Sequence, residues 1–311
     1  MTEFHHVSVL LDECIEGLDI KPDGSYVDGT LGGAGHSSQI AKRLTTGRLI
    51  GIDRDPVALK AAGERLAPWA DRVTLVHSNF CEIKQVLEDL NIDGVDGILL
   101  DLGVSSPQLD DGSRGFSYMA DAPLDMRMNS EDVMSAYDVV NTWSQEELKR
   151  ILYDYGEERY APRIASAICN RRAEKPIETT LELVDVIRGA MPAAALREKQ
   201  HPAKRSFQAI RIAVNDELGS VEKVMKDAIP ALNPGGRLAI ITFHSLEDRI
   251  VKNAMAEAAK GCTCPPSFPV CVCGKKPQVK LVSRKPIVSG EEELERNPRA
   301  RSAKLRVCEK K

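Results

Sequence analysis

The feature that most constrains this chain is the alternation of short apolar runs with helical segments in its first hundred residues. Stretches with helical patterning separate four apolar runs, each of which we expect to be a strand: 25–28, 48–53, 72–77 and 97–101. Strands and helices that alternate at this spacing form a parallel sheet covered by helices. The sequence therefore predicts an α/β fold with a doubly wound parallel sheet.

This alternation stops after the fourth expected strand. Between residues 109 and 205 no convincing strand occurs, and Ser144–Glu147 and Thr179–Glu182 have the form of capping boxes that open helices. Strand-like sequence then returns at 237–243, 279–282 and 304–307. We therefore expect a sheet domain formed by residues 1–108 and 206–311, with an all-helical domain inserted at residues 109–205.

The charge of the chain is unevenly distributed. The net charge of −4, from 42 basic and 46 acidic residues, by itself argues against a nucleic-acid partner. Residues 274–311, however, contain 12 Lys or Arg against 5 Asp or Glu, so this end carries +7 and the rest of the chain −11. Such asymmetry suggests an anionic partner for the basic end, and a solvated basic tail is the alternative.

No apolar run approaches the ~18 residues that a membrane span needs. The N-terminal sequence also lacks the basic and apolar blocks of a signal peptide. We therefore expect a cytoplasmic enzyme with no membrane partner.

A glycine-rich loop follows the first expected strand and indicates a nucleotide site. Gly32, Gly33 and Gly35 lie between that strand and a helix, where backbone N–H groups can approach a ligand closely. Asp53 ends the second strand, where a carboxylate can accept hydrogen bonds from the ribose hydroxyls of an adenosine. Ser38 stands where the dinucleotide pattern has Gly or Ala, which disfavours NAD relative to S-adenosylmethionine. The alternative is a tight turn followed by a helix cap.

Longer motifs identify the family that the chain resembles. It is similar to the RsmH/MraW family, bacterial 16S rRNA (cytosine-N4)-methyltransferases. The matching stretches, in order along almost the whole chain, are His6–Glu13, Asp28–His36, Gly51–Asp55, Asp101–Asp110, Arg114–Ser117, Pro123–Arg127, Tyr155–Glu158, His201–Ala203, Phe207–Arg211, Phe243–Arg249 and Asn297–Arg301.

The resemblance implies a Rossmann-like, class I methyltransferase that carries an inserted helical domain. It implies methyl transfer from S-adenosylmethionine to N4 of a cytidine, nucleotide 1402 in the decoding region of 16S rRNA within the small ribosomal subunit. A homodimer is compatible with it. Asp101 is the candidate catalytic residue. The cofactor contacts that the resemblance implies are Ala34, Gly35, His36, Asp53, Phe80, Asp101 and Gln108.

Other residues are candidates for substrate contacts. Phe243 or Phe207 would stack on the target base, with core packing as the alternative for either ring. His244, Ser245 and Asp248 do not have the spacing of a hydrolytic triad, and Ser245–Asp248 is instead expected to be a capping box. The side chains expected to contact RNA phosphates are Arg205, Arg211, Arg249, Lys275, Lys276, Arg284, Lys285, Arg299 and Arg301.

Four of the eight cysteines are clustered at Cys262, Cys264, Cys271 and Cys273. Closely spaced thiolates suit Zn²⁺, but a zinc knuckle usually has two residues between paired cysteines and this chain has one. Zinc, labile disulfides and plain loop cysteines all stay open, and no metal ligand is assigned.

Two other functions compete with rRNA methylation. The chain could methylate another nucleic acid, or it could be a ribosome-assembly factor that binds S-adenosylmethionine and in which catalysis is secondary. Methyl transfer to purified small subunits would separate these three functions.

Overall fold

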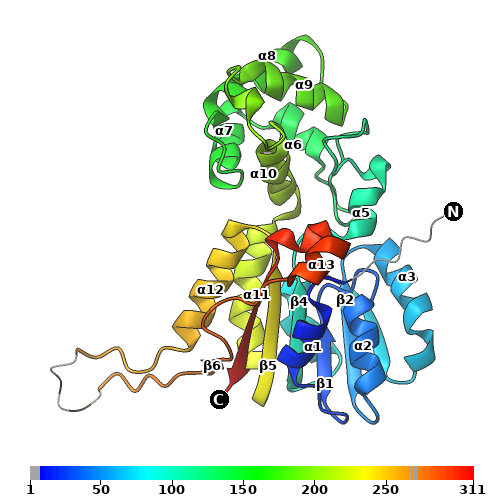
Figure 1. The fold of residues 1–311 in the computed structure, drawn as a ribbon, viewed down its shortest axis with the longest axis vertical. Coiled ribbons are helices and arrows are strands. Elements are labelled where there is room, and N and C mark those ends of the chain that lie inside the picture. The colour runs from blue at the N-terminus through cyan, green and yellow to red at the C-terminus, as the bar shows by residue number, and fades with distance from the viewer. Residues whose placement is uncertain (1–7, 266–267, 269, 271) are drawn as a thin grey trace. The chain divides into compact units, whose positions relative to one another are not determined.

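The computed structural model describes residues 8–265, 268, 270 and 272–311 (Figure 1). The chain folds into two compact units. The sheet unit comprises Met1–Gly103 and Leu218–Lys311, and the helical unit comprises Val104–Glu217. The boundaries expected from the sequence, after residues 108 and 205, differ from these. The second boundary lies later because α10 (Lys204–Asn215) packs its apolar face into the core of the helical unit.

The sheet unit contains a seven-stranded mixed sheet. Its order is β3-β2-β1-β4-β5-β7-β6. The first five strands of this order run parallel, whereas β7 is antiparallel to both of its neighbours. The strands are β1 (Ser25–Asp28), β2 (Arg48–Asp53), β3 (Val73–His77), β4 (Val95–Asp101), β5 (Leu232–Thr242), β6 (Val279–Leu281) and β7 (Lys304–Lys310).

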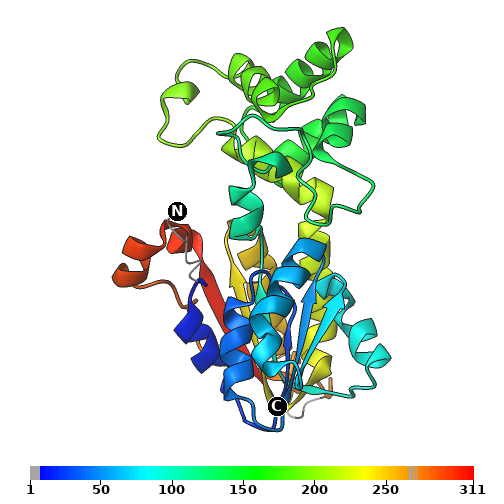
Figure 2. The same cartoon turned by 90° about the vertical axis from the view of Figure 1, so that its right-hand side faces the viewer.

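Two layers of helices cover the sheet, and the turned view in Figure 2 shows helices on both sides of it. One apolar core joins α1, α2 and α3 to one face, and a second joins α4, α11 and α12 to the other. The α/β fold and its helical insertion are therefore confirmed. The helices of this unit are α1 (Leu11–Leu18), α2 (Gly35–Arg43), α3 (Pro56–Leu66), α4 (Ile83–Asp89), α11 (Glu217–Ala231), α12 (Ser245–Ala258) and α13 (Glu291–Arg296).

The helical unit has its own hydrophobic core. Side chains from α6, α7, α8, α9 and α10 form it, together with the segment around Phe116 to Met128. Both expected capping boxes are present, at Ser144 with Glu147 and at Thr179 with Glu182. The helices of this unit are α5 (Ser106–Asp110), α6 (Ala136–Thr142), α7 (Gln145–Asp154), α8 (Ala161–Glu174), α9 (Thr180–Ala190) and α10.

Within the residues that the structure describes, no helix combines the length and the apolar character needed to cross a lipid bilayer.

The cap of α9 generates a stability prediction. Thr179 Oγ1 accepts the Glu182 N–H at 3.3 Å, and Glu182 Oε2 accepts the Glu178 N–H at 2.7 Å. Thr179→Ala should therefore lower the free energy of unfolding of the helical unit by about 1 kcal/mol. Chemical denaturation followed by circular dichroism measures this loss.

Thr142→Ala is the matched control. The hydroxyl of this exposed residue bonds the Asp138 carbonyl within the last turn of α6, so alanine should cost little there. An equal loss in both variants would contradict the capping explanation.

Candidate functional site

Three aspartates end neighbouring strands at one edge of the parallel sheet. Asp28 ends β1, Asp53 ends β2 and Asp101 ends β4. In register, Asp28 pairs with Gly51 and with Leu99, so Asp53 and Asp101 each lie two residues beyond its partners. Ligands of open parallel sheets bind at these carboxyl ends, where the order of the strands reverses. In this sheet the reversal occurs between β1 and β4.

The loop after β1 passes between β2 and β4. The Gly29 N–H donates to the Leu99 carbonyl on β4 at 2.9 Å, and the Leu31 N–H donates to the Ile52 carbonyl on β2 at 3.1 Å. Gly32 and Ala34 then take left-handed conformations, with φ of 48° and 56°. These two residues turn the chain into α2, whose first N–H groups have no acceptor within the helix and can face a ligand.

Asp53 is held by the same loop. Its Oδ2 accepts the Gly32 N–H at 2.7 Å, and its Oδ1 accepts the Asp55 N–H at 2.9 Å. Burial raises the pKa of this carboxyl above its usual value, although the backbone donors oppose the shift. A carboxylate offers about four acceptor positions. Asp53 can therefore accept further hydrogen bonds from a ligand while it holds the loop.

Asp28 connects the loop to α2 and to β4. Its Oδ2 accepts from Ser37 Oγ at 2.7 Å, and its Oδ1 accepts the Thr30 N–H at 3.2 Å. Thr30 Oγ1 in turn accepts the Asp101 N–H at 2.5 Å. Burial raises the pKa of Asp28 to about 6 despite these hydrogen bonds, and the Asp53 charge adds to the shift.

Asp101 differs from the other two aspartates because one of its oxygens is unsatisfied. Its Oδ1 is buried and has no hydrogen-bond partner among the residues that the structure describes, while 26% of the side chain stays exposed. Its Oδ2 lies 3.9 Å from His36 Nδ1, too far for a direct hydrogen bond. Burial, followed by the charges of Asp28 and Glu247, raises the pKa of Asp101 to about 8. A buried acceptor without a donor is typical of a site that receives a ligand.

Two half-buried aromatic rings flank this edge. A methyl group at Gly29 would approach Phe80 Cβ to 3.1 Å, so Phe80 lies against the loop after β1. A methyl group at Gly103 would lie 3.6 Å from Phe243 Cδ2, so Phe243 lies beside the chain that leaves β4. The site thus combines three carboxylates, loop N–H groups and two partly exposed rings.

Comparisons with known proteins identify the family to which this architecture belongs. The model of the MraW methylase family matches residues 3–311. The chain belongs to the MraW methylase family. A Brevibacillus brevis protein named ribosomal RNA small subunit methyltransferase H is 61% identical over 308 residues, which cover 99% of this chain and 98% of that protein.

Two further likenesses differ in strength. A Heliobacterium mobile protein with the same name is 58% identical over 310 residues, 99% of each chain. The solved structure of an rRNA methylase from Streptococcus thermophilus is 10% identical, with a TM-score of 0.41, and covers 96% of this chain and 92% of that one. That last likeness is too distant to bear on function.

The sheet unit of this MraW methylase brings together most of the residues expected to contact the cofactor. Ala34 caps α2, and Gly35 and His36 are its first residues. Asp53 and Asp101 are the last residues of β2 and β4, and Phe80 follows the end of β3. His36 Nε2 lies 3.0 Å from the Val9 carbonyl, which fixes the orientation of the ring.

Gln108 belongs to α5 of the helical unit. It is buried, its Oε1 accepts the Ser105 N–H at 3.1 Å, and its Nε2 donates to the Met128 carbonyl at 3.4 Å. These contacts are structural, and its contact with the cofactor stays a prediction.

Two residues proposed to contact the substrate have structural partners in this methylase. Phe207 is only 3% exposed and packs edge-on against Tyr118 in the helical core, so the core-packing alternative is correct for this ring. Arg211 makes a two-point ion pair with Glu217, at 2.8 and 2.9 Å. Phe243 therefore stays the candidate for base stacking.

At the start of α12 the expected capping box of Ser245 and Asp248 is wrong, and Glu247 has a role that the sequence did not predict. The capping box uses His244 and Glu247, not Ser245 and Asp248. Glu247 is 1% exposed, and its Oε2 accepts the Phe243 N–H at 2.9 Å. Asp248 instead pairs with Arg306 on β7 at 2.7 Å. The sequence signal for Glu247 was its place in the third position of the helix.

Many of the side chains expected to contact RNA are exposed in the described part of the chain. Lys275 is the exception at the basic end, since it is half-buried and pairs with Glu257. Those that are exposed are Arg249, Lys276, Arg284, Lys285, Arg299 and Arg301.

The contact between Gly35 and Ser8 generates a prediction for the loop. A Cβ at Gly35 would lie 1.8 Å from Ser8 Oγ and 3.2 Å from Ser8 Cβ, and Ser8 is buried. Gly35→Ala should therefore lower the free energy of unfolding of the ligand-free protein by about 1–3 kcal/mol through overpacking. Adding Ser8→Gly should restore part of that loss.

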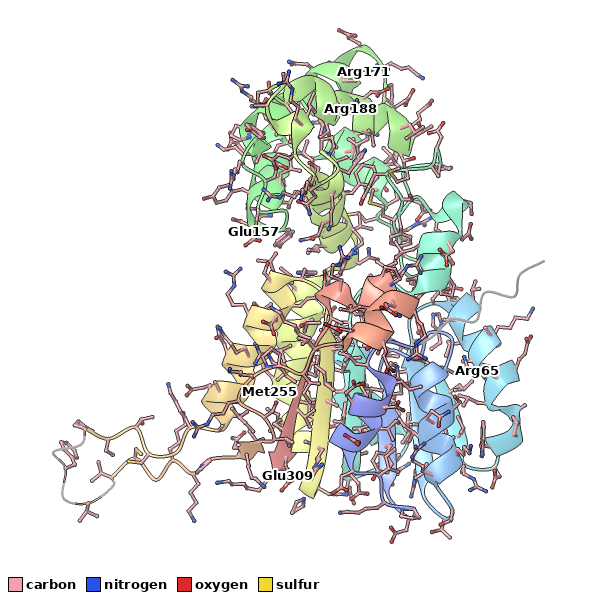
Figure 3. The ribbon with its side chains drawn as sticks, in the orientation of Figure 1. Arg65, Glu157, Arg171, Arg188, Met255 and Glu309 are labelled. Atoms are coloured by element: carbon pink, nitrogen blue, oxygen red, sulfur yellow. The ribbon has the colours of Figure 1, made fainter. Side chains whose placement is uncertain are left out.

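Gly33→Ala serves as the control in the same loop. A Cβ there meets nothing within 4 Å, so the melting temperature should change little. Arg65, which extends from α3 (Figure 3), donates to the Gly33 carbonyl at 3.0 Å, and this bond does not involve the position of the added methyl. A similar loss in both variants, or no rescue by Ser8→Gly, would contradict the steric explanation.

Proposed function

We propose that this MraW-family methylase transfers a methyl group from S-adenosylmethionine to N4 of a cytidine in 16S rRNA, at nucleotide 1402. The observation that carries this proposal is the match of the family to nearly the whole chain, together with relatives about 60% identical that are named small-subunit rRNA methyltransferases. The geometry of the sheet edge supports the proposal independently.

The residues at the sheet edge suit S-adenosylmethionine, the methyl donor of the family. Asp53 keeps acceptor capacity for the ribose hydroxyls, and the N-terminus of α2 offers N–H groups. Phe80 has a half-exposed ring beside the loop, where it can pack on the adenine. We assign cofactor contacts to Ala34, Gly35 and His36 on the same grounds.

Asp101 suits the chemistry of an amino group. The cofactor supplies a methyl group bonded to a positively charged sulfur. Cytosine N4 is a weak nucleophile because its lone pair is conjugated with the ring, so placement in line with the methyl is the main task of the enzyme. The unsatisfied Asp101 Oδ1 can accept a hydrogen bond from an amino proton, which leaves electron density on nitrogen as it attacks. The same carboxylate can take the proton that nitrogen must lose after transfer.

Phe243 is the proposed platform for the target base. Its ring lies half-buried beside Gly103, two residues after Asp101 along the chain. Stacking on an aromatic ring holds an unpaired base and tolerates any sequence around it. Since the amino edge of a paired cytosine is blocked, the target must be single-stranded or flipped out.

The homodimer and the cytoplasmic location stay predictions.

The substrate assignment is tested with small ribosomal subunits from a strain that lacks the enzyme. Purified protein and isotopically labelled S-adenosylmethionine should label one cytidine of 16S rRNA, identified by nuclease mapping and mass spectrometry as N4-methylated at position 1402. Subunits from the parent strain, which already carry the modification, are the control and should accept almost no label.

Other outcomes would favour the competing functions. Label in DNA or in another RNA, with none in the subunits, would support a different nucleic-acid substrate. Binding of S-adenosylmethionine without transfer to any of these would support the assembly-factor hypothesis.

The raised pKa of Asp101 predicts how activity depends on pH. The carboxylate form needed to accept the amino proton forms as the pH rises through about 8, so kcat/KM of the free enzyme should increase across this range. Asp101→Asn should lower kcat by about 100-fold or more and remove this inflection. Asp93→Asn changes an exposed carboxylate before β4 and should leave both unchanged.

Ionisation of Asp101, which should raise activity as the pH rises, should lower the stability of the fold over the same pH range. A carboxyl whose pKa is higher in the folded protein than in the unfolded chain destabilises the fold as pH rises between the two values. Ligand-free Asp101→Asn should therefore melt at a higher temperature than the parent protein at pH 8, and the difference should shrink toward pH 4. A lower melting temperature at pH 8 would show that Asp101 is primarily structural.

A further inference from the structure

The segment between α12 and β6 brings together three cysteines that are at most eleven residues apart in the sequence. α12 ends at Ala258 and β6 begins at Val279 (Figure 1), and the Gln278 N–H donates to the Ala258 carbonyl at 2.8 Å, which brings the two ends of this segment together. The Sγ atoms of Cys262, Cys264 and Cys273 all lie within 4.8 Å of one another. Cys271, the fourth cysteine of the sequence motif, lies outside the described residues.

The distances between the sulfur atoms fit a shared metal ion. Cys262 Sγ and Cys273 Sγ are 3.7 Å apart, which excludes a disulfide between them since an S–S bond is about 2.05 Å long. Four thiolates at ~2.3 Å from a tetrahedral zinc ion would have sulfur atoms ~3.8 Å apart. The observed pair therefore has the separation that zinc coordination requires.

The backbone also supports thiolate at this position. The Cys264 N–H points to Cys262 Sγ, with a nitrogen–sulfur distance of 3.4 Å. A donor aimed at sulfur stabilises the charged form that binds metal, in the same way that outer contacts orient other metal ligands. Although only one residue separates them, Cys262 Sγ and Cys264 Sγ lie within 4.8 Å of each other.

Hydrophobic packing does not account for the cluster. The large apolar side chains described in this segment are exposed: Phe268 by 49%, Val270 by 71% and Val272 by 74%. Cys262 and Cys273 are themselves exposed, so burial of apolar surface does not hold them together. A metal ion shared by the three sulfur atoms would tie the two ends of such a segment together.

We infer that Cys262, Cys264 and Cys273 bind one Zn²⁺ as thiolates and that this ion ties the chain just after α12 to the chain just before β6. Soft thiolate ligands at close spacing select zinc over hard cations such as Mg²⁺. Binding releases three protons, and three thiolates with Zn²⁺ carry a net charge of −1. A fourth position of the tetrahedron takes one further donor.

The inferred ion is structural because it would bind far from the sheet edge that carries Asp53 and Asp101. α12 begins directly after β5, at the edge that carries Asp53 and Asp101, and its 14 residues run away from that edge for about 21 Å. The cysteines follow the far end of α12. The inference is therefore independent of the proposed methyl transfer.

Metal content tests the inference. The full chain, purified without a metal-affinity step and under reducing conditions, should contain about one zinc per chain by mass spectrometry. A thiol-specific mercurial should release this zinc, and Co²⁺ substituted for it should give a sulfur-to-metal charge-transfer band with the visible bands of tetrahedral cobalt. Cys262→Ser and Cys273→Ser should each weaken zinc binding at least 100-fold.

Cys169→Ser is the matched control, because Cys169 lies on α8 in the helical unit and should not affect zinc content. Melting temperatures of all variants show whether each remains folded. Less than 0.1 zinc per chain after incubation with Zn²⁺ and dialysis would overturn the inference, and so would full retention of zinc in the Cys262→Ser/Cys264→Ser/Cys273→Ser variant.

Discussion

The buried carboxylate of Asp28 is the interaction on which the geometry of the site depends. It lies on β1, between the two strands whose ends carry Asp53 and Asp101, and it binds Ser37 on α2 and the Thr30 N–H in the loop. Thr30 then accepts the Asp101 N–H, so one buried acid sets both the path of the loop and the end of β4. A buried charge without these donors would be strongly destabilising, which explains why the loop is so fully bonded.

Features set by local sequence could be predicted well. The capping boxes at Ser144 and Thr179 are decided by residues within four positions, and both form as expected. The order of the last strands could not be predicted in the same way. β7 pairs with β5 across more than sixty intervening residues, and no local pattern specifies that β7 enters between β5 and β6.

The site shows the same division. Asp53 and the glycine loop could be placed because strand ends of a parallel sheet meet at one edge. The burial of Phe207 depends on tertiary contacts within the helical unit, and Arg211 meets Glu217 because the chain turns at Asp216 between α10 and α11. The sequence around these residues did not distinguish a surface role from a structural one. Glu247 was missed because its task, to hold the Phe243 N–H, is visible only once the helix start is known.

The antiparallel β7 has a consequence for the order in which the chain folds during synthesis. Because β7 sits between β5 and β6, the sheet has a gap until residues 304–310 have left the ribosome. Within the described residues β6 pairs with β7 alone, so it has no partner before then. The helical unit, by contrast, is continuous in sequence and can form its core earlier. The nascent chain would therefore expose the unpaired edge of β5 until β7 has been synthesised, which makes this edge open to mispairing with another chain.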